Sequence, residues 1–269
     1  MKKLSSISLA GALATGLVIA GSAGLTTAAN AGTADAAAKA PYRVTLKVSE
    51  SAAIAGETKL ALTGKVRPKP EKGSPVSLQI QYEGKDRWKT VRTVGVKKDG
   101  SFAFSDKPGT SQERSYRVVK GKDAGGAKGI SRERAVEVQA WKWLDSFTTS
   151  AGADVLDIYE IPVNGETYRR NLVLDRTKDS GFEEWTFGRK CTVFESTLGL
   201  SDRTETGGQG GIVVTSDGVV KYARTFNLGE SELRTIDVTD VYRMRLDFGQ
   251  VTTTPDTEPT AAAARVLCD

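Results

Sequence analysis

From Tyr42 onward, apolar side chains recur at every second residue, and this period constrains the fold more than any other feature. It is clearest in residues 42–48, 76–82 and 242–248, where each apolar residue is followed by a polar or charged one. A period of two places one face of a β-strand in a core and the other face in water. No long stretch of the chain has the 3.6-residue period of a helix. The sequence therefore predicts an all-β protein.

The first half of this pattern contains about seven short strands within about 100 residues. We predict them at 42–48, 59–67, 76–82, 88–96, 102–104, 116–118 and 136–138. An Asp99-Gly100 pair marks a hairpin turn between two of these strands. This density of strands is typical of an immunoglobulin-like or fibronectin-like β-sandwich.

The second half has its own set of strands. We predict them at 156–161, 172–174, 185–194, 212–214, 219–223, 233–238 and 242–248. Asn164-Gly165 and Asp217-Gly218 are hairpin turn signals. Trp185 shares its alternating register with Phe187, so we expect it in the core. These features indicate a second β-sandwich.

The charge changes sign between the two halves. Residues 42–140 hold 21 Lys and Arg against 11 Asp and Glu, and residues 141–269 hold 14 against 21. We therefore predict one domain at 42–140 and another at 141–269, joined near residues 139–143. The basic charge of the first domain is either a solvated strand face or a binding surface for anionic polymers. It lacks the aromatic-interleaved basic strip of an RNA-binding domain, so we do not expect nucleic acid as a partner.

The first residues have the features of an export signal. Lys2 and Lys3 precede an apolar run rich in glycine and alanine, and Ala29-Asn30-Ala31 is a small-residue cleavage site, with 34–36 as a second choice. The alternative is an uncleaved membrane anchor. We predict a signal peptide at 1–31, an alanine-rich linker at 32–41, and a secreted or cell-wall-associated protein with no membrane span after processing.

Cys191 and Cys268 are the two cysteines of the chain. In an oxidising compartment a pair of cysteines is expected to be bridged, and the alternative is two buried thiols. Two cysteines without a histidine do not form the usual zinc set, and we predict no metal and no cofactor.

The sequence offers little for catalysis. It contains no histidine, which excludes a serine–histidine or cysteine–histidine nucleophile, and it has no P-loop, GxSxG or HExxH pattern. Carboxylates such as Glu183, Glu184, Asp202 and Glu205 leave a glycosidase-like pair open. Because charged residues at turns usually form a solvated rim, we predict that the protein is not an enzyme.

Several phrases of the second half resemble one known family. They are WLDSF at 143–147, WTFGRKCTVFESTLGLSD at 185–202, SDGVVKYARTFNLGE at 216–230, RTIDVTDVYRMRLDF at 234–248 and AAAARVLC at 261–268. Together they resemble the NPCBM modules first noted beside glycoside hydrolases of family 98. That resemblance implies a galactose-binding-like (jelly-roll) sandwich and a carbohydrate ligand.

The first half is similar to bacterial Ig-like modules that accompany surface-binding domains. The similarity rests on GSPVSLQ at 73–79, WKTV at 88–91, DGSFAF at 99–104 and YRV at 116–118. It implies a spacer domain that presents its neighbour.

Sugar binding needs an apolar ring face with a few polar groups placed around it. We predict that Tyr168, Arg169 and Asn171, together with Asp202 and Arg203, form the carbohydrate-binding site because they flank predicted turns. The predicted function is a secreted, non-catalytic, lectin-like protein that binds glycans or cell-wall polysaccharide. The alternative is a structural or adhesion protein that binds a protein partner without recognising sugar.

Overall fold

The computed structural model describes residues 39–251 and 256–269. The predicted signal peptide, and the predicted linker up to residue 38, lie outside these ranges. Within them, no helix is long and apolar enough to cross a membrane.

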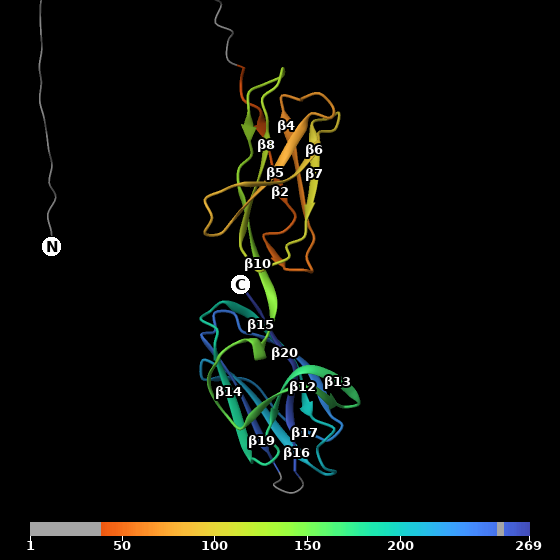
Figure 1. The fold of residues 1–269 in the computed structure, drawn as a ribbon, viewed down its shortest axis with the longest axis vertical. Coiled ribbons are helices and arrows are strands. Elements are labelled where there is room, and N and C mark those ends of the chain that lie inside the picture. The colour runs from red at the N-terminus through yellow and green to blue at the C-terminus, as the bar shows by residue number, and fades with distance from the viewer. Residues whose placement is uncertain (1–38, 252–255) are drawn as a thin grey trace, which may run out of the picture. The chain divides into compact units, whose positions relative to one another are not determined.

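The first sandwich has two sheets that enclose one core. One sheet contains β1, β4, β2 and β7, and the other contains β5, β6, β8 and β9 together with β3 and β10 (Figure 1). The strands are β1 (Arg43–Val44), β2 (Lys47–Val48), β3 (Ala52–Ile54), β4 (Leu60–Arg67), β5 (Pro75–Tyr82), β6 (Lys89–Gly95), β7 (Ser101–Asp106), β8 (Arg114–Lys120), β9 (Gly129–Ile130) and β10 (Arg134–Trp143). The alternating residues of these strands form the core, among them Leu60, Leu62 and Tyr116.

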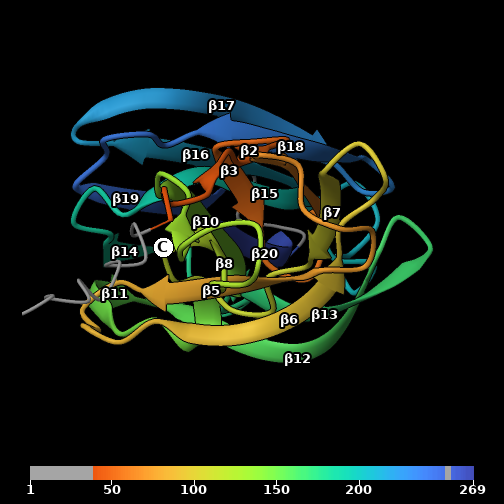
Figure 2. The same cartoon turned by 90° about the horizontal axis from the view of Figure 1, so that it is seen from above.

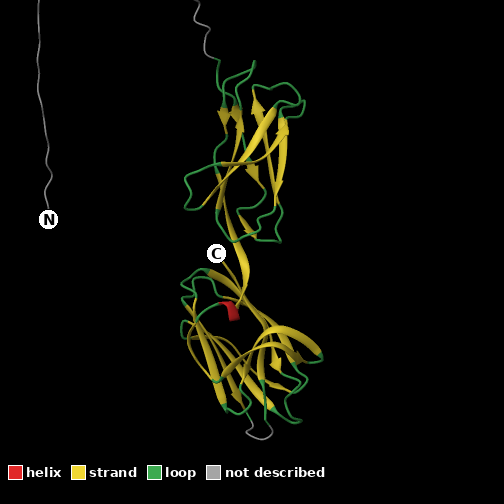
Figure 3. Ribbon diagram, in the orientation of Figure 1, coloured by secondary structure: helices red, strands yellow, loops and turns green. Residues whose placement is uncertain are grey.

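The second sandwich also has two sheets. Strands β11, β14, β19, β16 and β17 form one sheet, and Figure 2 shows them in that order; β12, β13, β20, β15 and β18 lie in the other. The elements are the 3-10 turn η1 (Leu144–Ser146), β11 (Thr149–Ala153), β12 (Val155–Val163), β13 (Glu166–Leu174), β14 (Ser180–Thr186), β15 (Cys191–Leu200), β16 (Gln209–Ser216), β17 (Val219–Asn227), β18 (Ser231–Asp237), β19 (Arg243–Gln250) and β20 (Pro259–Cys268). Figure 3 shows η1 as the short helical segment among these strands. Trp185 is 1% exposed and lies in the core, as predicted.

These elements confirm the predicted all-β sandwich class. The turns Asn164-Gly165 and Asp217-Gly218 both have two consecutive residues with positive φ, as their sequences predict for two-residue hairpins. The single strand predicted at 185–194 is wrong. Gly188 and Arg189 have φ of 61° and 62°, and this left-handed pair separates β14 from β15.

Strand β10 belongs to both sets of sheets. Its residues 134–136 pair with β8, residues 137–139 pair with β3, and residues 140–143 pair with β20. The predicted junction near 139–143 is therefore not a loop but part of a continuous strand. A division into domains at 140/141 stays a proposal, and the boundary would fall within β10.

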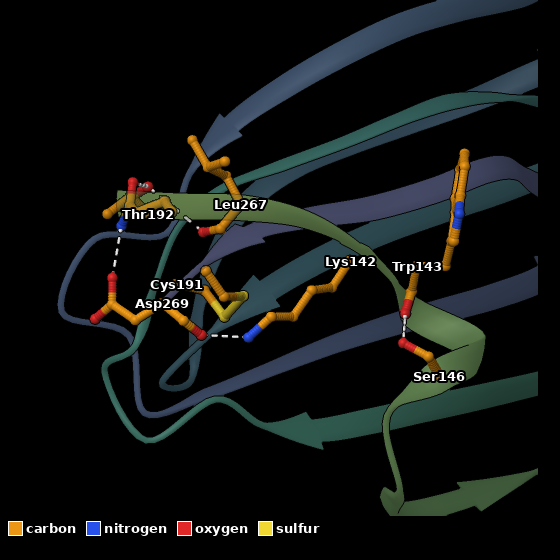
Figure 4. The surroundings of a disulfide bond; sticks show 9 residues. Lys142, Trp143, Ser146, Cys191, Thr192, Leu267 and Asp269 are labelled. Atoms are coloured by element: carbon orange, nitrogen blue, oxygen red, sulfur yellow. Dashed lines mark hydrogen bonds between the residues drawn. A yellow bond between two sulfur atoms is a disulfide. The ribbon is translucent and has the colours of Figure 1, made fainter. Parts of the chain in front are cut away.

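Cys191 and Cys268 form a disulfide, which confirms the predicted bridge. The two residues are directly opposed on β15 and β20, and both are at least 98% buried. Figure 4 shows Lys142 beside the bond, with its ammonium group on the main-chain oxygen of Asp269. The disulfide thus lies at the end of β20 that also pairs with β10.

Candidate functional site

Asp202, a predicted site residue, contacts the 164–165 turn that precedes the predicted site residues of β13. The carboxylate of Asp202 accepts hydrogen bonds from the backbone N–H groups of Asn164 and Gly165, at 2.8 and 2.9 Å. These bonds fix the turn, and they occupy one lone pair on each oxygen of Asp202. The side chain of Arg203 is exposed next to it.

Tyr168 and Arg169 follow that turn on β13. Tyr168 is half-buried against a small apolar cluster, and its hydroxyl donates to Glu166 at 3.0 Å. Arg169 is exposed and its Nε donates to Glu160 at 2.9 Å. Both polar groups therefore have partners within the same hairpin, and their contact with sugar stays a prediction.

Asn171 was predicted to be a sugar-binding residue beside a turn, but its side chain is buried in the sheet. It is 1% exposed, and its amide Nδ2 donates to the carbonyl oxygens of Ile158, Tyr168 and Tyr159, at 2.9, 3.0 and 3.4 Å. Its Oδ1 accepts from the N–H of Ala263 at 3.2 Å. Asn171 thus satisfies backbone groups within the sheet, so the role that the structure shows for it is structural.

A stronger cluster of sugar-binding residue types lies on the outer face of the sheet that contains β10, β20, β15 and β18. Directly paired residues on antiparallel strands point to the same side. One row of paired residues across the four strands is Trp143, Arg265, Glu195 and Thr235. A second row on the same face is Trp141, Leu267, Val193 and Asp237. In the intervening row, Phe194 and Val266 are fully buried in the core. We name Trp141, Trp143, Glu195, Thr235 and Arg265 the tryptophan face.

An ion pair occupies the middle of the tryptophan face. Arg265 Nε donates to Glu195 Oε1 at 2.9 Å, and the guanidinium lies 4.3 Å from the ring centroid of Trp141. Contact with an aromatic ring and a carboxylate together holds the guanidinium in one place. The remaining N–H donors of Arg265 are free to bind a ligand, because among the described residues the side chain bonds only Glu195.

The second tryptophan is held in a similar way. Arg170 Nη1 donates to both carboxylate oxygens of Asp145, at 3.0 and 2.9 Å, and its guanidinium lies 5.9 Å from the ring centroid of Trp143. Arg170 has a φ of 61°, a left-handed conformation in the middle of β13. Trp141 and Trp143 are both half-buried, so each indole presents part of its surface at the outer face.

A shallow pocket adjoins the far edge of the tryptophan face. It has a volume of about 400 Å³, lies between the edge strands β17 and β18, and is lined by Lys221, Tyr222, Arg234, Thr235, Ile236 and Asp237. The hydroxyl of Tyr222 donates to Glu232 at 2.9 Å, and burial raises the pKa of that hydroxyl. Thr235 and Asp237 belong both to the pocket and to the aligned rows. Ring faces, hydroxyls and charges thus follow one another across four strands.

Two carboxylates of the second sandwich, Asp157 on β12 and Glu183 on β14, have raised pKa values. Burial, and then the nearby charge of Asp157, raise the pKa of Glu183 to about 7. Burial and the charge of Asp145 raise the pKa of Asp157. In the part of the chain that the structure describes, no group of three or more such ligands is arranged to hold a metal ion.

The pKa of Glu183 gives a testable pH dependence. A carboxyl group whose pKa is about 7 when folded and about 4.5 when unfolded stabilises the fold below about pH 4.5, and this contribution is lost as the pH rises to about 7. We expect Glu183→Gln to raise the free energy of unfolding at pH 8 by about 1–2 kcal/mol, a value reduced for partial exposure of the side chain. At pH 4 we expect almost no change. Urea unfolding at both pH values measures this, and an equal effect at both would contradict it.

Sequence reasoning missed the tryptophan face for a physical reason. In the segment Trp141-Lys142-Trp143, alternation suggests tryptophans in the core and lysine outside. The structure reverses this order, because Lys142 is aligned with the buried Val266 and reaches the main chain of Asp269 from the end of the strand. The signal that was available is the pair of tryptophans two residues apart on one strand, a spacing that puts both rings on one face.

No protein-family model matches the chain, and no curated protein matches it. The chain is similar to the solved structure of CBM51 from Clostridium perfringens GH95 in complex with methyl-galactose, at 10% identity, 47% of this chain, 99% of that chain and a TM-score of 0.40.

Two further solved structures match at a comparable sequence identity. CBM51-2 and INT domains of Clostridium perfringens ZmpB, in complex with GlcNAc, match at 12% identity over 84% of this chain and 48% of that chain, with a TM-score of 0.41. The CBM22-1-CBM22-2 tandem of Paenibacillus barcinonensis Xyn10C matches at 11% identity over 85% of this chain and 94% of that chain, with a TM-score of 0.25. All three TM-scores are below 0.5.

Proposed function

We propose that this protein is an exported, non-catalytic carbohydrate-binding protein whose glycan site is the tryptophan face. The observation that supports this most is the row Trp143–Arg265–Glu195–Thr235, which places an indole, a fixed ion pair and a hydroxyl on neighbouring strands. Neighbouring strands are about 4.8 Å apart, so the row spans about 14 Å. A surface of this extent matches a short oligosaccharide better than a single small ion.

The chemistry of each group fits a sugar. An indole packs against the C–H surface of a pyranose ring, and burial of apolar area there favours binding. Arg265 donates hydrogen bonds to sugar oxygens, whereas Glu195 accepts them from sugar hydroxyls. Because Arg265 and Glu195 are already paired, the site loses little side-chain entropy when a ligand binds.

The test is titration of the full chain with a glycan identified on an array. We expect Trp143→Ala to weaken binding at least tenfold, because it removes one ring of the face. Val220→Ala is the matched control, since Val220 is 58% exposed on β17 and is not part of the face. It should change affinity less than twofold.

The site residues predicted from the sequence define a competing location for the glycan site, which the same titration tests. If Tyr168→Ala or Arg203→Ala abolishes binding and Trp143→Ala does not, the site is at the 164–165 turn and the proposal for the tryptophan face is wrong. If the wild-type chain binds no glycan, the proposal of a carbohydrate-binding protein is wrong, and the alternative of an adhesion protein that binds a protein partner takes its place. Exposed Leu233, Val219 and Tyr242 would then be the first residues to test for contact with a protein partner.

A further inference from the structure

The first sandwich contains a groove with four cationic side chains on its walls. It has a volume of about 640 Å³ and is lined by residues 41–47 on one side and by Ile130, Arg132 and Arg134 on the other. Arg43 and Lys47 are the cations of the first wall. Among the described residues no carboxylate lines the groove, and its two walls belong to different sheets, β1 and β2 on one side and β9 and β10 on the other.

In the part of the chain that the structure describes, no ion pair neutralises the cations of this groove. Among the described residues of the first sandwich, the ion pairs are Lys65–Asp99, Arg114–Asp106 and Lys120–Asp123, and none of them involves the four groove cations. Arg134 donates through Nε to the main-chain oxygen of Leu46 at 3.2 Å, which ties the two walls together. Arg43, Lys47 and Arg132 are exposed.

The spacing of the cations is that of a strand. The pairings of Arg43 with Arg67 and of Lys47 with Thr63 keep one register, so residues 43–47 are extended. At about 3.4 Å per residue, Arg43 and Lys47 lie about 14 Å apart along the groove. Cations in series along a trough suit a polymer with repeated negative charges, whereas a single small anion would contact only one or two of them.

The other lining groups favour a sugar polymer over other polyanions. Thr45 lies between Arg43 and Lys47, with its hydroxyl bonded to the main chain of Lys65, and Ile130 is 45% exposed on the opposite wall. The one aromatic residue of the lining, Tyr42, is 3% exposed and its hydroxyl donates to Asp123, so it offers no ring face for stacking a nucleic-acid base. A recessed groove also accommodates a polymer chain better than it accommodates a flat membrane surface.

We propose that this groove binds an acidic polysaccharide, a sugar polymer with a carboxylate or phosphate on its repeating unit. The guanidinium groups of Arg43 and Arg132 and the ammonium of Lys47 pair with these carboxylates or phosphates, and Thr45 and Ile130 contact the sugar rings. A neighbouring pocket is lined by Glu50 and Glu133 as well as Lys47 and Arg134. Because carboxylates are present there, the series of cations without carboxylates ends at this pocket. The groove is separate from the tryptophan face, so either site can fail without the other.

The test compares two charge reversals of equal size in the full chain. Arg43→Glu/Arg132→Glu alters the groove, and Lys89→Glu/Arg92→Glu alters exposed cations on β6 that do not line it. The probes are carboxymethyl-dextran and dextran phosphate, with neutral dextran and poly-glutamate as controls for sugar and for charge. Arg43→Ala/Arg132→Ala is the milder second variant, and circular dichroism checks that each variant folds.

We expect wild type to bind the anionic dextrans with an affinity that falls as salt shortens the Debye length from about 10 Å at 0.1 M to about 3 Å at 1 M. The groove reversal should weaken binding at least tenfold and the alanine variant several-fold, while the β6 reversal changes it less than threefold. The two anionic dextrans show whether carboxylate or phosphate is preferred. Equal losses in both reversals would show a general charge effect and overturn the proposal. So would equal binding of poly-glutamate, equal binding of neutral dextran, or no binding of either anionic dextran.

Discussion

Replacing both cysteines by alanine lowers the free energy of unfolding of the second sandwich by about 4 kcal/mol. This expected result follows from the separation of 77 residues between Cys191 and Cys268, because a cross-link that closes so long a loop removes much of the entropy of the unfolded chain. The bond joins β15 to β20 beside the rows that carry Arg265 and Glu195. We therefore expect the variant to lose glycan affinity as its second sandwich begins to unfold.

Guanidinium unfolding of Cys191→Ala/Cys268→Ala against the oxidised wild type measures this effect. Wild type held in reductant is the matched control, because it has the same sequence without the bond and should lose a similar amount. Two findings would contradict the expectation. One is an unchanged unfolding midpoint, and the other is alkylation of both cysteines in native, unreduced protein.

Asn171→Ala should cost about 2–4 kcal/mol of unfolding free energy although it removes only a small polar side chain. The amide of Asn171 bonds main-chain groups of Ile158, Tyr168 and Ala263 inside the sheet. Truncation leaves these buried groups without partners, and the desolvation cost of each is about 1–3 kcal/mol, partly relieved by local rearrangement. Ala263 has a φ of 49°, so β20 is irregular at the position that Asn171 supports.

Arg169→Ala is the control for this prediction, since it lies two residues away on the same strand but pairs with Glu160 in solvent. Exposed ion pairs contribute less than about 1 kcal/mol, so its effect on unfolding should be small. The decisive comparison is glycan affinity under conditions in which both variants are folded. If Asn171→Ala unfolds like wild type but loses binding, its amide contacts the ligand and the structural role is wrong.

The fold could be predicted largely because its strands keep a strict alternation of apolar and polar residues. Leu60, Leu62 and Val66 lie in the first core as their spacing indicates, and Met244, Leu246 and Phe248 lie in the second. The very short strands β3 and β9 were not predicted, because two or three residues are too few for a period to appear, and β11 was missed because its sequence, TSAGA, has no alternation of large apolar residues. The turn at Gly188-Arg189 was missed because both flanking segments continue the same alternation.

The candidate site was harder to predict, because it depends on which strands are neighbours. Trp143, Arg265 and Glu195 are up to 122 residues apart in the chain and meet only through the pairing of β10, β20 and β15. Residues near turns, such as Asp202 and Arg203, were easier to nominate because turn signals are local. A buried polar residue such as Asn171 has the same sequence signature as an exposed one, so its bonds to the main chain could not be inferred.

The passage of β10 through both sets of sheets has a mechanical consequence. Ten consecutive residues, from Arg134 to Trp143, are paired first with β8, then with β3 and finally with β20. A pulling force applied to the second sandwich is passed along the main chain of β10. There, several inter-strand hydrogen bonds jointly resist the sliding of β10 past its neighbouring strands. A protein anchored to one polymer and attached to another would carry tension through this strand, with no extensible tether between its two sandwiches.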